Sequence, residues 1–420
     1  MRAARFCKYL PEHEIQPIVL TSKEDSYTNT DSSLEVPAGI RVERAASWST
    51  PLDWYKLLPS MSRRNKPDQG REKSKPNPYA SSRGWWRRNL LVLLQTPDRN
   101  WGWYVPAVRN ASRLIEKEQV KAIFSSAPPW TSHLIARHLK LKYNLPWLAD
   151  FRDPWFWDSS SELPRWRRQF DRKMQLTCIR LADRVLCNTE QMRELFVSMD
   201  PCIHAGKFVT LTNGFDDSPF PEASIARKHG PRLLLHAGEI YGLRRIDTFC
   251  EAVAILIREG KIDSSQLDIL FVGDMDPQLL AAAQTRSPEI FESGRVRIQP
   301  RVNWEEAQKI ITRTDLLLLF QGGHRLQVPA KFYEYLQSGK PMFAIATKGA
   351  LTDLLEETGA GIWADPADPQ EIAAKLLEAL KLPAVLPSDV QEGFGKYHYR
   401  ALTSRLAEWI KEEVRAPSSK

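Results

Sequence analysis

Short apolar segments that alternate with helical patterns constrain the fold of this chain more than any other feature. Each segment is four to six residues long and rich in branched or aromatic side chains, as expected for buried strands. The stretches between them carry apolar residues at helical spacing. This alternation is typical of parallel, doubly wound α/β sheets, in which helices cover both faces of the sheet.

The first series of alternating elements lies before residue 216. Strands are expected at residues 17–21, 122–125, 147–151, 184–188 and 208–212. Helices are expected at residues 2–10, 107–118, 131–143, 163–182 and 190–199. Residues 47–103 interrupt the series with prolines, tryptophans and basic side chains. We interpret them as an insertion in a first domain that spans residues 1–215.

The second series begins after a Gly- and Pro-containing linker at 213–227 and predicts a second α/β domain, residues 216–385. Its strands are expected at residues 232–237, 268–272, 296–299, 315–320, 341–346 and 361–364. Its helices are expected at residues 247–259, 276–286, 304–312, 330–338, 352–358 and 369–380. Residues 386–420 would form a C-terminal helical segment, with one helix at about 391–414, that packs back toward the first domain.

The start of the sequence departs from the doubly wound pattern. Such a domain ordinarily opens with a central strand and a glycine-rich turn. This sequence opens instead with the helical pattern at 2–10. We therefore expect the first domain to lack its first strand. Two interpretations stay open, that Met1 is not the original start and that the domain is incomplete.

The positive charge of the chain is local. The formal net charge is +8. Residues 61–90 hold nine basic side chains against Asp68 and Glu72, so they carry +7 of that total. A near-neutral remainder disfavours a general nucleic-acid partner. The tryptophan-rich basic stretch would either dock on an anionic inner membrane leaflet or form a solvated loop, and single-stranded nucleic acid ranks last.

No metal site, cofactor or membrane span is expected. The five cysteines form no C-x-x-C pair and no two histidines have metal-ligand spacing on a helix. No apolar run approaches the roughly 20 residues that span a bilayer, and no secretory signal pattern opens the sequence. We expect a cytoplasmic protein, with membrane contact limited to the periphery of the inner membrane face.

A candidate anion site follows the strand predicted at 315–320. Gly322 and Gly323 come directly after it, and Pro329 opens the next helix. Lys331 falls in the first turn of that helix, with Glu334 on the same helical face. A cation and a carboxylate placed there would bind a phosphate and a pair of ribose hydroxyls. The alternative is an ordinary Lys–Glu pair on the surface of the helix.

A second candidate lies in the segment HAGEIYGLRR at 236–245. A strand leads into a glycine turn, and two arginines precede the next helix. The backbone N–H of Gly238 and the guanidinium of Arg244 or Arg245 would suit a diphosphate. The alternative is an ordinary loop with a solvated arginine pair.

Several motifs resemble the group 1 family of GT-B-type glycosyltransferases. In the second half they are HAGEIYGLRR, FVGD, PAKFYEYLQSGKP and GAGIWADP, and in the first half SSAPPWTSHLIA, WLADFRDPW, CNTE and TNGFD. The resemblance covers nearly the whole chain and implies two Rossmann-like domains that face each other across a cleft. It also implies retaining, metal-independent transfer of a sugar from a nucleoside diphosphate donor. The family's second glutamate is replaced by Leu326, as in members with a P-x-K-x-x-E-Y motif.

The resemblance also assigns roles to residues. Arg244 or Arg245 would hold the donor diphosphate together with Lys331, and Glu334 would bind the ribose. Gly322, Gly323 and Gly238 would allow close approach of the donor sugar, and the turn at 300–302 would border the base.

Two loops of the first domain, residues 125–133 and 150–155, follow predicted strand ends and are candidates for the acceptor side. Asp153 would orient the acceptor or handle its proton, and His133 would contact the donor sugar. The alternatives are a local turn or an Arg152 pair for Asp153, and a satisfied helix histidine for His133.

These features favour a glycosyltransferase that acts on a glycan or lipid-linked acceptor in cell-surface polysaccharide or glycoconjugate assembly. Two other functions stay open, a nucleotide-sugar 2-epimerase and a non-catalytic sugar-nucleotide-binding protein. The sequence does not specify the nucleobase, the sugar or the acceptor.

Overall fold

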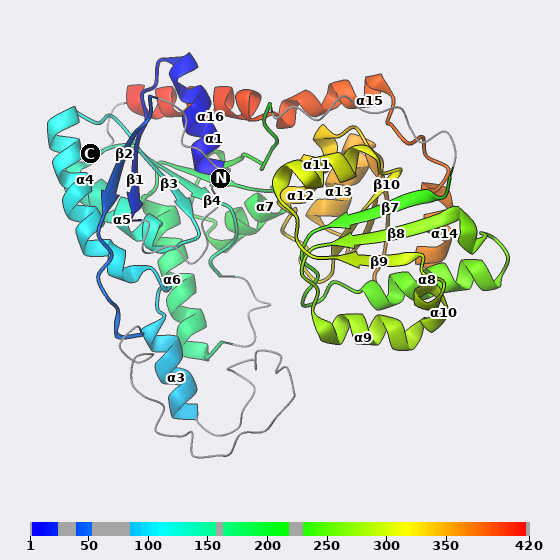
Figure 1. Ribbon diagram of the computed structural model, residues 1–420. Coiled ribbons are helices and arrows are strands. Elements are labelled where there is room, and N and C mark those ends of the chain that lie inside the picture. Colours follow the sequence, from blue (N-terminus) through cyan, green and yellow to red (C-terminus); the bar gives the residue numbers. More distant parts are fainter. Residues whose placement is uncertain (1, 24–38, 53–84, 157–162, 218–229, 417–420) are drawn as a thin grey trace. The chain divides into compact units, whose positions relative to one another are not determined.

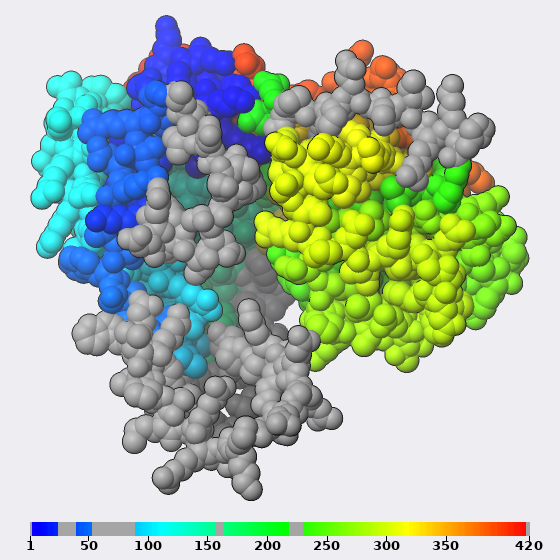
Figure 2. All heavy atoms as spheres, viewed as in Figure 1, coloured from blue at the N-terminus to red at the C-terminus, as the bar shows by residue number. Residues whose placement is uncertain are grey.

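The computed structural model divides the chain into two compact units (Figure 1). The structure describes residues 2–23, 39–52, 85–156, 163–217 and 230–416, which are the coloured spheres in Figure 2. Unit 1 consists of Met1–Leu211 and Thr403–Lys420, and unit 2 of Thr212–Leu402. Both units are built on parallel sheets, so the expected α/β class is confirmed.

Unit 1 holds a four-stranded parallel sheet, in the order β3-β4-β5-β6, and a separate parallel pair, β1-β2. The strands are β1 (Ile18–Ser22), β2 (Arg41–Ala45), β3 (Ile123–Ala127), β4 (Trp147–Phe151), β5 (Arg184–Cys187) and β6 (Phe208–Thr210). The helices are α1 (Arg2–Tyr9), α3 (Trp85–Leu94), α4 (Tyr104–Glu118), α5 (Thr131–Tyr143), α6 (Arg165–Leu181) and α7 (Glu190–Met199). Short 3-10 turns are η1 (Leu10–His13), η3 (Trp101–Trp103) and η4 (Ala205–Lys207). Among these strands, none joins β1 to β3.

The core of unit 1 forms around β4, which is buried along its whole length. Trp147 and Phe151 on this strand share an apolar cluster with Phe196 of α7. A second cluster joins Ala45 of β2 to side chains of α4 and α5. A strand buried on both faces needs an apolar sequence with little alternation, as the sequence of β4 shows.

The ends of the segment expected as an insertion meet in space. The backbone N–H of Trp48 donates to the carbonyl of Gly102 over 3.0 Å. A Cβ atom at Gly102 would lie 2.1 Å from the Trp48 carbonyl oxygen, so only glycine fits there. Residues 53–84 of this segment lie outside the described residues.

Unit 2 is a six-stranded parallel sheet in the order β12-β11-β10-β7-β8-β9. Its strands are β7 (Arg232–Ala237), β8 (Leu267–Val272), β9 (Val296–Gln299), β10 (Leu316–Gln321), β11 (Met342–Ala346) and β12 (Gly361–Ala364). Its helices are α8 (Ile246–Arg258), α9 (Pro277–Arg286), α10 (Pro288–Glu292), α11 (Trp304–Thr312), α12 (Ala330–Gln337), α13 (Ala350–Thr358) and α14 (Pro369–Ala379), with the 3-10 turn η5 (Ser264–Gln266). The strand order reverses between β7 and β10, which is where ligands bind in sheets of this kind.

Alternate residues of the central strands face opposite sides of this sheet. Leu316 and Leu318 of β10 belong to the apolar cluster that includes α8. Leu317 and Leu319 belong to the cluster that includes α12. The helices α8 and α12 therefore cover opposite faces, and each follows one of the two strands at the switch point.

The prediction of a single helix at about 391–414 is wrong. The chain forms α15 (Ser388–Glu392), the 3-10 turn η6 (Gly393–Tyr397) and α16 (Tyr399–Arg415). His398 separates the last two with an extended backbone, ψ 136°. Gly393 and Gly395 weaken helical propensity just before this break. Within unit 1, Glu413 of α16 pairs with Arg184 of β5 over 2.7 Å.

The bounds of the expected strands agree with those in the structure to within about two residues. The elements β2, α3 and α10 were not expected. None of the helices in the described residues has both the length and the apolarity needed to cross a membrane.

Candidate functional site

Lys331 lies against the end of β7, at the switch point of the unit 2 sheet. A Cβ atom at Gly238, directly after β7, would lie 2.4 Å from Lys331 Cε. The absence of a side chain at Gly238 is therefore what lets the lysine cross this strand end. The N–H of Gly238, which we expected to bind diphosphate, donates instead to the Val272 carbonyl over 2.7 Å. That expectation is wrong, and Gly238 contributes space rather than a donor.

Tyr335 fixes the helix that carries Lys331. The N–H of Ala237, the last residue of β7, donates to the buried Tyr335 hydroxyl over 3.0 Å. Burial raises the pKa of this hydroxyl, which therefore stays protonated. The bond ties α12 directly to β7 beside Gly238.

Lys331 and Glu334 form no ion pair within the described residues. The two side chains form no ion pair with each other, and neither has a hydrogen-bond partner within the described part of the chain. Both are partly buried. The surface Lys–Glu pair that we considered as the alternative is therefore not formed, and both charges remain for a ligand.

The two arginines before α8 differ in their partners. Arg245 forms a two-point ion pair with Asp247, with both N–O distances at 2.8 Å. Arg244 lies over the ring of Tyr241, 4.1 Å from its centroid, and donates to the Glu239 carbonyl. No carboxylate lies within 4 Å of Arg244 in the described residues. Arg244 thus has the uncompensated charge.

Gly322 and Gly323 accommodate the loop before α8. Cβ atoms at these positions would lie 2.2 Å from the Leu243 carbonyl oxygen and 2.6 Å from Leu243 Cδ1, respectively. Gly323 also adopts a φ of +76°, which favours glycine. The neighbour that these glycines admit is therefore the β7–α8 loop, which brings the end of β10 against the arginine segment.

His236 lies buried beneath this junction in β7. Its Nδ1 bonds to the Leu318 carbonyl over 2.9 Å, so Nδ1 carries the proton. Burial, together with the charges of Lys331 and Arg244, lowers the pKa of His236 to about 3. The imidazole is neutral at physiological pH, so the positive charge here comes from Lys331 and Arg244.

The turn at 300–302, expected to border a base, follows β9.

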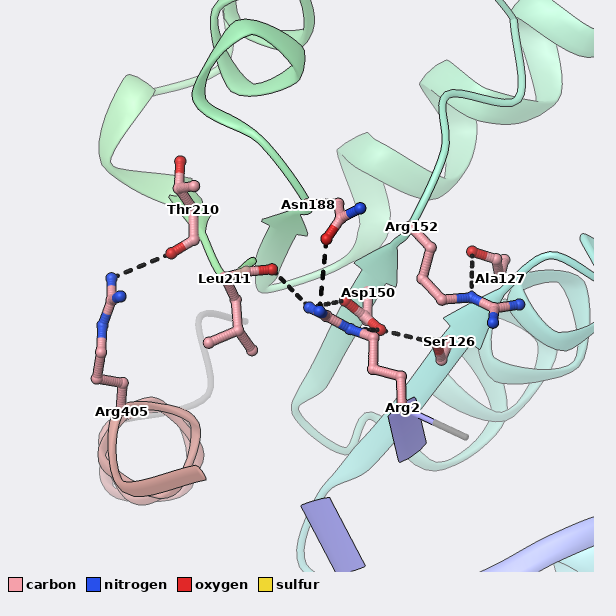
Figure 3. Close-up of polar contacts among 9 residues, drawn as sticks. All are labelled: Arg2, Ser126, Ala127, Asp150, Arg152, Asn188, Thr210, Leu211 and Arg405. Carbon is pink, nitrogen blue, oxygen red and sulfur yellow. Dashed lines mark hydrogen bonds and ion pairs between the residues drawn. The ribbon is translucent and has the colours of Figure 1, made fainter. Parts of the chain in front are cut away.

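In unit 1 a buried arginine joins the carboxyl ends of the sheet strands (Figure 3). Arg2 of α1 contacts both carboxylate oxygens of Asp150 in β4 at 3.0 and 3.1 Å. Arg2 also donates to the Leu211 carbonyl, over 2.6 Å, after β6. Ser126 of β3 donates to Asp150 over 2.7 Å. We did not anticipate this network, although a charged residue in the apolar strand sequence WLADF signals a buried partner.

His133 is fully buried in α5, beside the ring of Phe151 at 4.3 Å. Trp147 donates its indole N–H to Ser125 Oγ over 2.8 Å, and that hydroxyl lies 2.8 Å from His133 Nδ1. Ser125 can then donate to Nδ1, which leaves the proton of the imidazole on Nε2. Nε2 has no partner in the described residues. Burial and the charge of Arg152 lower the pKa of His133 to about 3, so it is a neutral donor and a poor base.

Asp153 lies half-buried in the loop after β4. The neighbouring Arg152 directs its guanidinium to the carbonyls of Ala127 and Pro128. No ion pair joins Arg152 to Asp153 among the residues that the structure describes. The local pair considered for Asp153 is therefore not formed.

One group of side chains in the described residues has the spacing of metal ligands. It comprises Asp216, Asp217 and His398, with ligand atoms within 4.8 Å of one another. His398 Nε2 already pairs with Asp217 over 2.9 Å. Gln337, at the opposite end of α12 from Lys331, donates to the Asp216 carbonyl. The group is thus separate from the residues around Lys331.

Comparison with known families decides the identity of the chain. Residues 231–381 match the family described as "Glycosyl transferases group 1", and residues 1–214 match the "Glycosyl transferase 4-like domain". The chain belongs to the group 1 glycosyltransferases. Together the two matches cover the cores of both units.

Individual relatives of this glycosyltransferase agree with the family assignment. A D-inositol 3-phosphate glycosyltransferase of Thermobispora bispora is 28% identical over 250 residues, which are 56% of this chain and 57% of the relative. The chain thus spans little more than half the length of this curated relative. A glycosyltransferase structure from Rickettsia africae has a TM-score of 0.61 at 12% identity and covers 98% of this chain and 94% of its own.

Anabaena HepE, solved in complex with UDP, has a TM-score of 0.56 at 16% identity over 73% of this chain and 82% of its own. Likeness at such low identity concerns the fold alone. It confirms the expected pair of Rossmann-like domains of GT-B type.

Proposed function

We propose that this glycosyltransferase transfers a sugar from a nucleoside diphosphate sugar to a glycan or lipid-linked acceptor. The observation that carries the proposal is the pair of unused charges at the β7–β10 switch point. Lys331 crosses Gly238 without an acidic partner in the described residues, and Glu334 lies one turn along the same helix. We place the reaction in cell-surface polysaccharide or glycoconjugate assembly, on the cytoplasmic side of the membrane. The name of the Thermobispora relative agrees with sugar transfer, and the UDP bound to HepE agrees with such a donor.

In the proposed reaction the bond between the anomeric carbon and the diphosphate oxygen breaks. Negative charge then develops on the leaving diphosphate. Lys331 and Arg244 are the cations that would stabilise it, and the N-terminal end of α12 adds its dipole. Glu334 would accept hydrogen bonds from the ribose hydroxyls. No residue is needed as a nucleophile if the acceptor oxygen attacks on the face that the diphosphate leaves, which gives retention and requires no metal.

On the acceptor side we assign roles to His133 and Asp153. His133 would donate its Nε2–H to a hydroxyl of the donor sugar, because it is neutral and this N–H has no partner in the described residues. The acceptor hydroxyl must lose its proton as the new bond forms. That proton would pass to the leaving diphosphate or to the carboxylate of Asp153.

The decisive experiment supplies the purified chain with a panel of nucleoside diphosphate sugars and a membrane extract, followed by mass spectrometry. We expect an acceptor whose mass increases by one sugar residue, together with free nucleoside diphosphate. Release of an epimerised donor without an acceptor product would indicate a 2-epimerase. Donor binding without any turnover would indicate a non-catalytic binding protein.

Asp153→Asn tests the acceptor side separately. The substitution keeps the size of the side chain but removes its negative charge. We expect turnover to fall by at least about 100-fold, in the range of a lost acid–base group, while donor affinity and melting temperature stay near wild type. Calorimetry with donor, measured in parallel, supplies the control. A lower melting temperature with an unchanged rate per folded molecule would make Asp153 a structural residue.

A further inference from the structure

The helices α3 and α6 of unit 1 leave a group of apolar side chains uncovered. Leu90, Leu93 and Trp166 are 44%, 57% and 37% exposed. The indole N–H of Trp166 donates to the Asn89 side chain over 2.8 Å, which places the start of α6 against α3. Leu93 lies four residues after Asn89 and thus on the same side of α3. The three side chains therefore belong to one surface.

Basic side chains continue this surface along α6. Arg165, Arg172 and Lys173 are exposed. Arg165 and Arg172 are seven residues apart, as are Trp166 and Lys173, so each pair shares a face two turns apart. None of the three cations has a carboxylate within 4 Å in the described residues.

The acidic residue of this stretch does not offset the charge. Asp171 is buried and bonds to Arg167 over 2.8 Å, so it is not exposed on the same face. Here the term α3–α6 surface denotes Leu90, Leu93, Arg165, Trp166, Arg172 and Lys173.

We propose that the α3–α6 surface docks on an anionic lipid bilayer. Exposed leucines gain free energy when they enter the boundary between headgroups and acyl chains, and tryptophan favours that boundary. Unpaired arginine and lysine side chains are attracted to anionic headgroups. A nucleic acid would use the cations but would gain nothing from two exposed leucines. The inference goes beyond the proposed reaction, because it holds whatever sugar or acceptor is used.

The experiment measures co-sedimentation of the full chain with phosphatidylcholine vesicles that contain either no phosphatidylglycerol or about 30 mole per cent of it. We expect binding only to the anionic vesicles, weakening as salt rises. The triple variant Arg165→Gln/Arg172→Gln/Lys173→Gln should bind roughly 100-fold more weakly, from about fivefold for each cation. Leu90→Ser/Leu93→Ser should lose roughly tenfold or more through its apolar contribution.

Matched controls separate this surface from general charge and hydrophobicity. Arg113→Gln/Lys117→Gln/Lys121→Gln removes three exposed cations on and just after α4 and should retain wild-type binding. Leu141→Ser removes an exposed leucine of α5 and should also retain it. Thermal melting verifies that every variant is folded.

Three results would overturn the proposal: equal binding to neutral vesicles, equal loss in the α4 control, or unchanged binding by the α6 triple variant. Binding of single-stranded DNA without vesicle binding would overturn it in favour of a nucleic-acid surface. Because vesicle binding needs no donor, these results are independent of the transfer assay.

Discussion

At the scale of single residues, Lys331 offers the sharpest test of the donor site. Lys331→Ala should weaken binding of a nucleoside diphosphate by about 1.5–3 kcal/mol, the range for a hydrogen bond to a charged group. Isothermal calorimetry with UDP, GDP and ADP measures the affinity. Lys375→Ala is the matched control, because Lys375 is a partly exposed lysine paired with Glu378 on α14. Unchanged affinity in folded Lys331→Ala would remove the lysine from the site.

Tyr335 is a positioning residue for the same site. Tyr335→Phe would leave the buried Ala237 N–H without its acceptor, at a cost of about 1–3 kcal/mol to the free energy of unfolding. Because that bond ties α12 to β7, we also expect weaker nucleoside diphosphate binding well below the melting temperature. The control is Tyr333→Phe on the same helix, where the ring lies against Tyr397. A lower melting temperature with unchanged affinity would show a purely structural role for Tyr335.

The sequence identifies these residues better than it identifies their contacts. The spacing of Lys331 and Glu334 puts both on one face of a helix after a strand end, and the structure agrees. Whether they pair depends on rotamers and on neighbours, which spacing does not determine. The N–H of Gly238 donates to the carbonyl of Val272, a partner 34 residues away in the chain. Likewise, the rings beside His133 come from Trp130, just before α5, and from Trp147 and Phe151 in β4, a combination that spacing in the sequence does not reveal.

At the scale of elements, the Arg2–Asp150 ion pair fastens α1 to the unit 1 sheet. Arg2→Met would leave Asp150 buried without its counter-charge, and we expect it to lower the free energy of unfolding by about 3–5 kcal/mol. The double variant Arg2→Met/Asp150→Asn should recover part of that loss. Chemical denaturation measures both.

The control for this prediction is Arg41→Met, because Arg41 forms a pair with Glu43 that is exposed to solvent. Its cost should be small, because an exposed ion pair contributes little to the free energy of unfolding. A cost for Arg2→Met no larger than that of Arg41→Met would contradict the importance of the buried pair.

Element boundaries follow closely from the sequence where the apolar pattern is strong. β7 and β10 are near-continuous apolar runs, and both were expected within one residue of their observed bounds. β2 has the sequence RVERA and only its last residue is buried, so it lacks the apolar signal of a buried strand. The sequence did not predict α3, because this helix follows a long basic stretch that resembles a loop. The final helix was overextended because its apolar spacing continues across Gly393 and Gly395.

At the scale of the whole molecule, each unit contains one histidine that folding keeps neutral. The pKa values of His133 in unit 1 and His236 in unit 2 fall from an ordinary 6.5 to about 3. Between these values the unfolded chain binds a proton that the folded chain does not. Stability is therefore fully present above pH 6.5 and is lost as pH falls toward 3, by up to about 1.4 kcal/mol per pH unit for each histidine.

Unfolding curves at several pH values between 7 and about 4 test this expectation for both units. The slope of stability against pH should become shallower in His133→Gln and in His236→Gln, each relative to wild type. Carboxylates titrate in the same window, so the comparison between slopes isolates the histidine. Equal slopes in variants and wild type would mean that the histidines do not govern this loss.

The division of unit 1 into two chain segments has a consequence for its synthesis. Unit 2 is one continuous stretch and can fold as soon as it leaves the ribosome. Unit 1 requires Thr403–Lys420, where Glu413 meets Arg184 of β5. At 5–20 residues per second, the ribosome needs about 10–40 s to translate the roughly 190 residues between the two segments. Throughout that interval, nascent unit 1 awaits its last helix, so chaperones that bind emerging chains have the longest access to this unit.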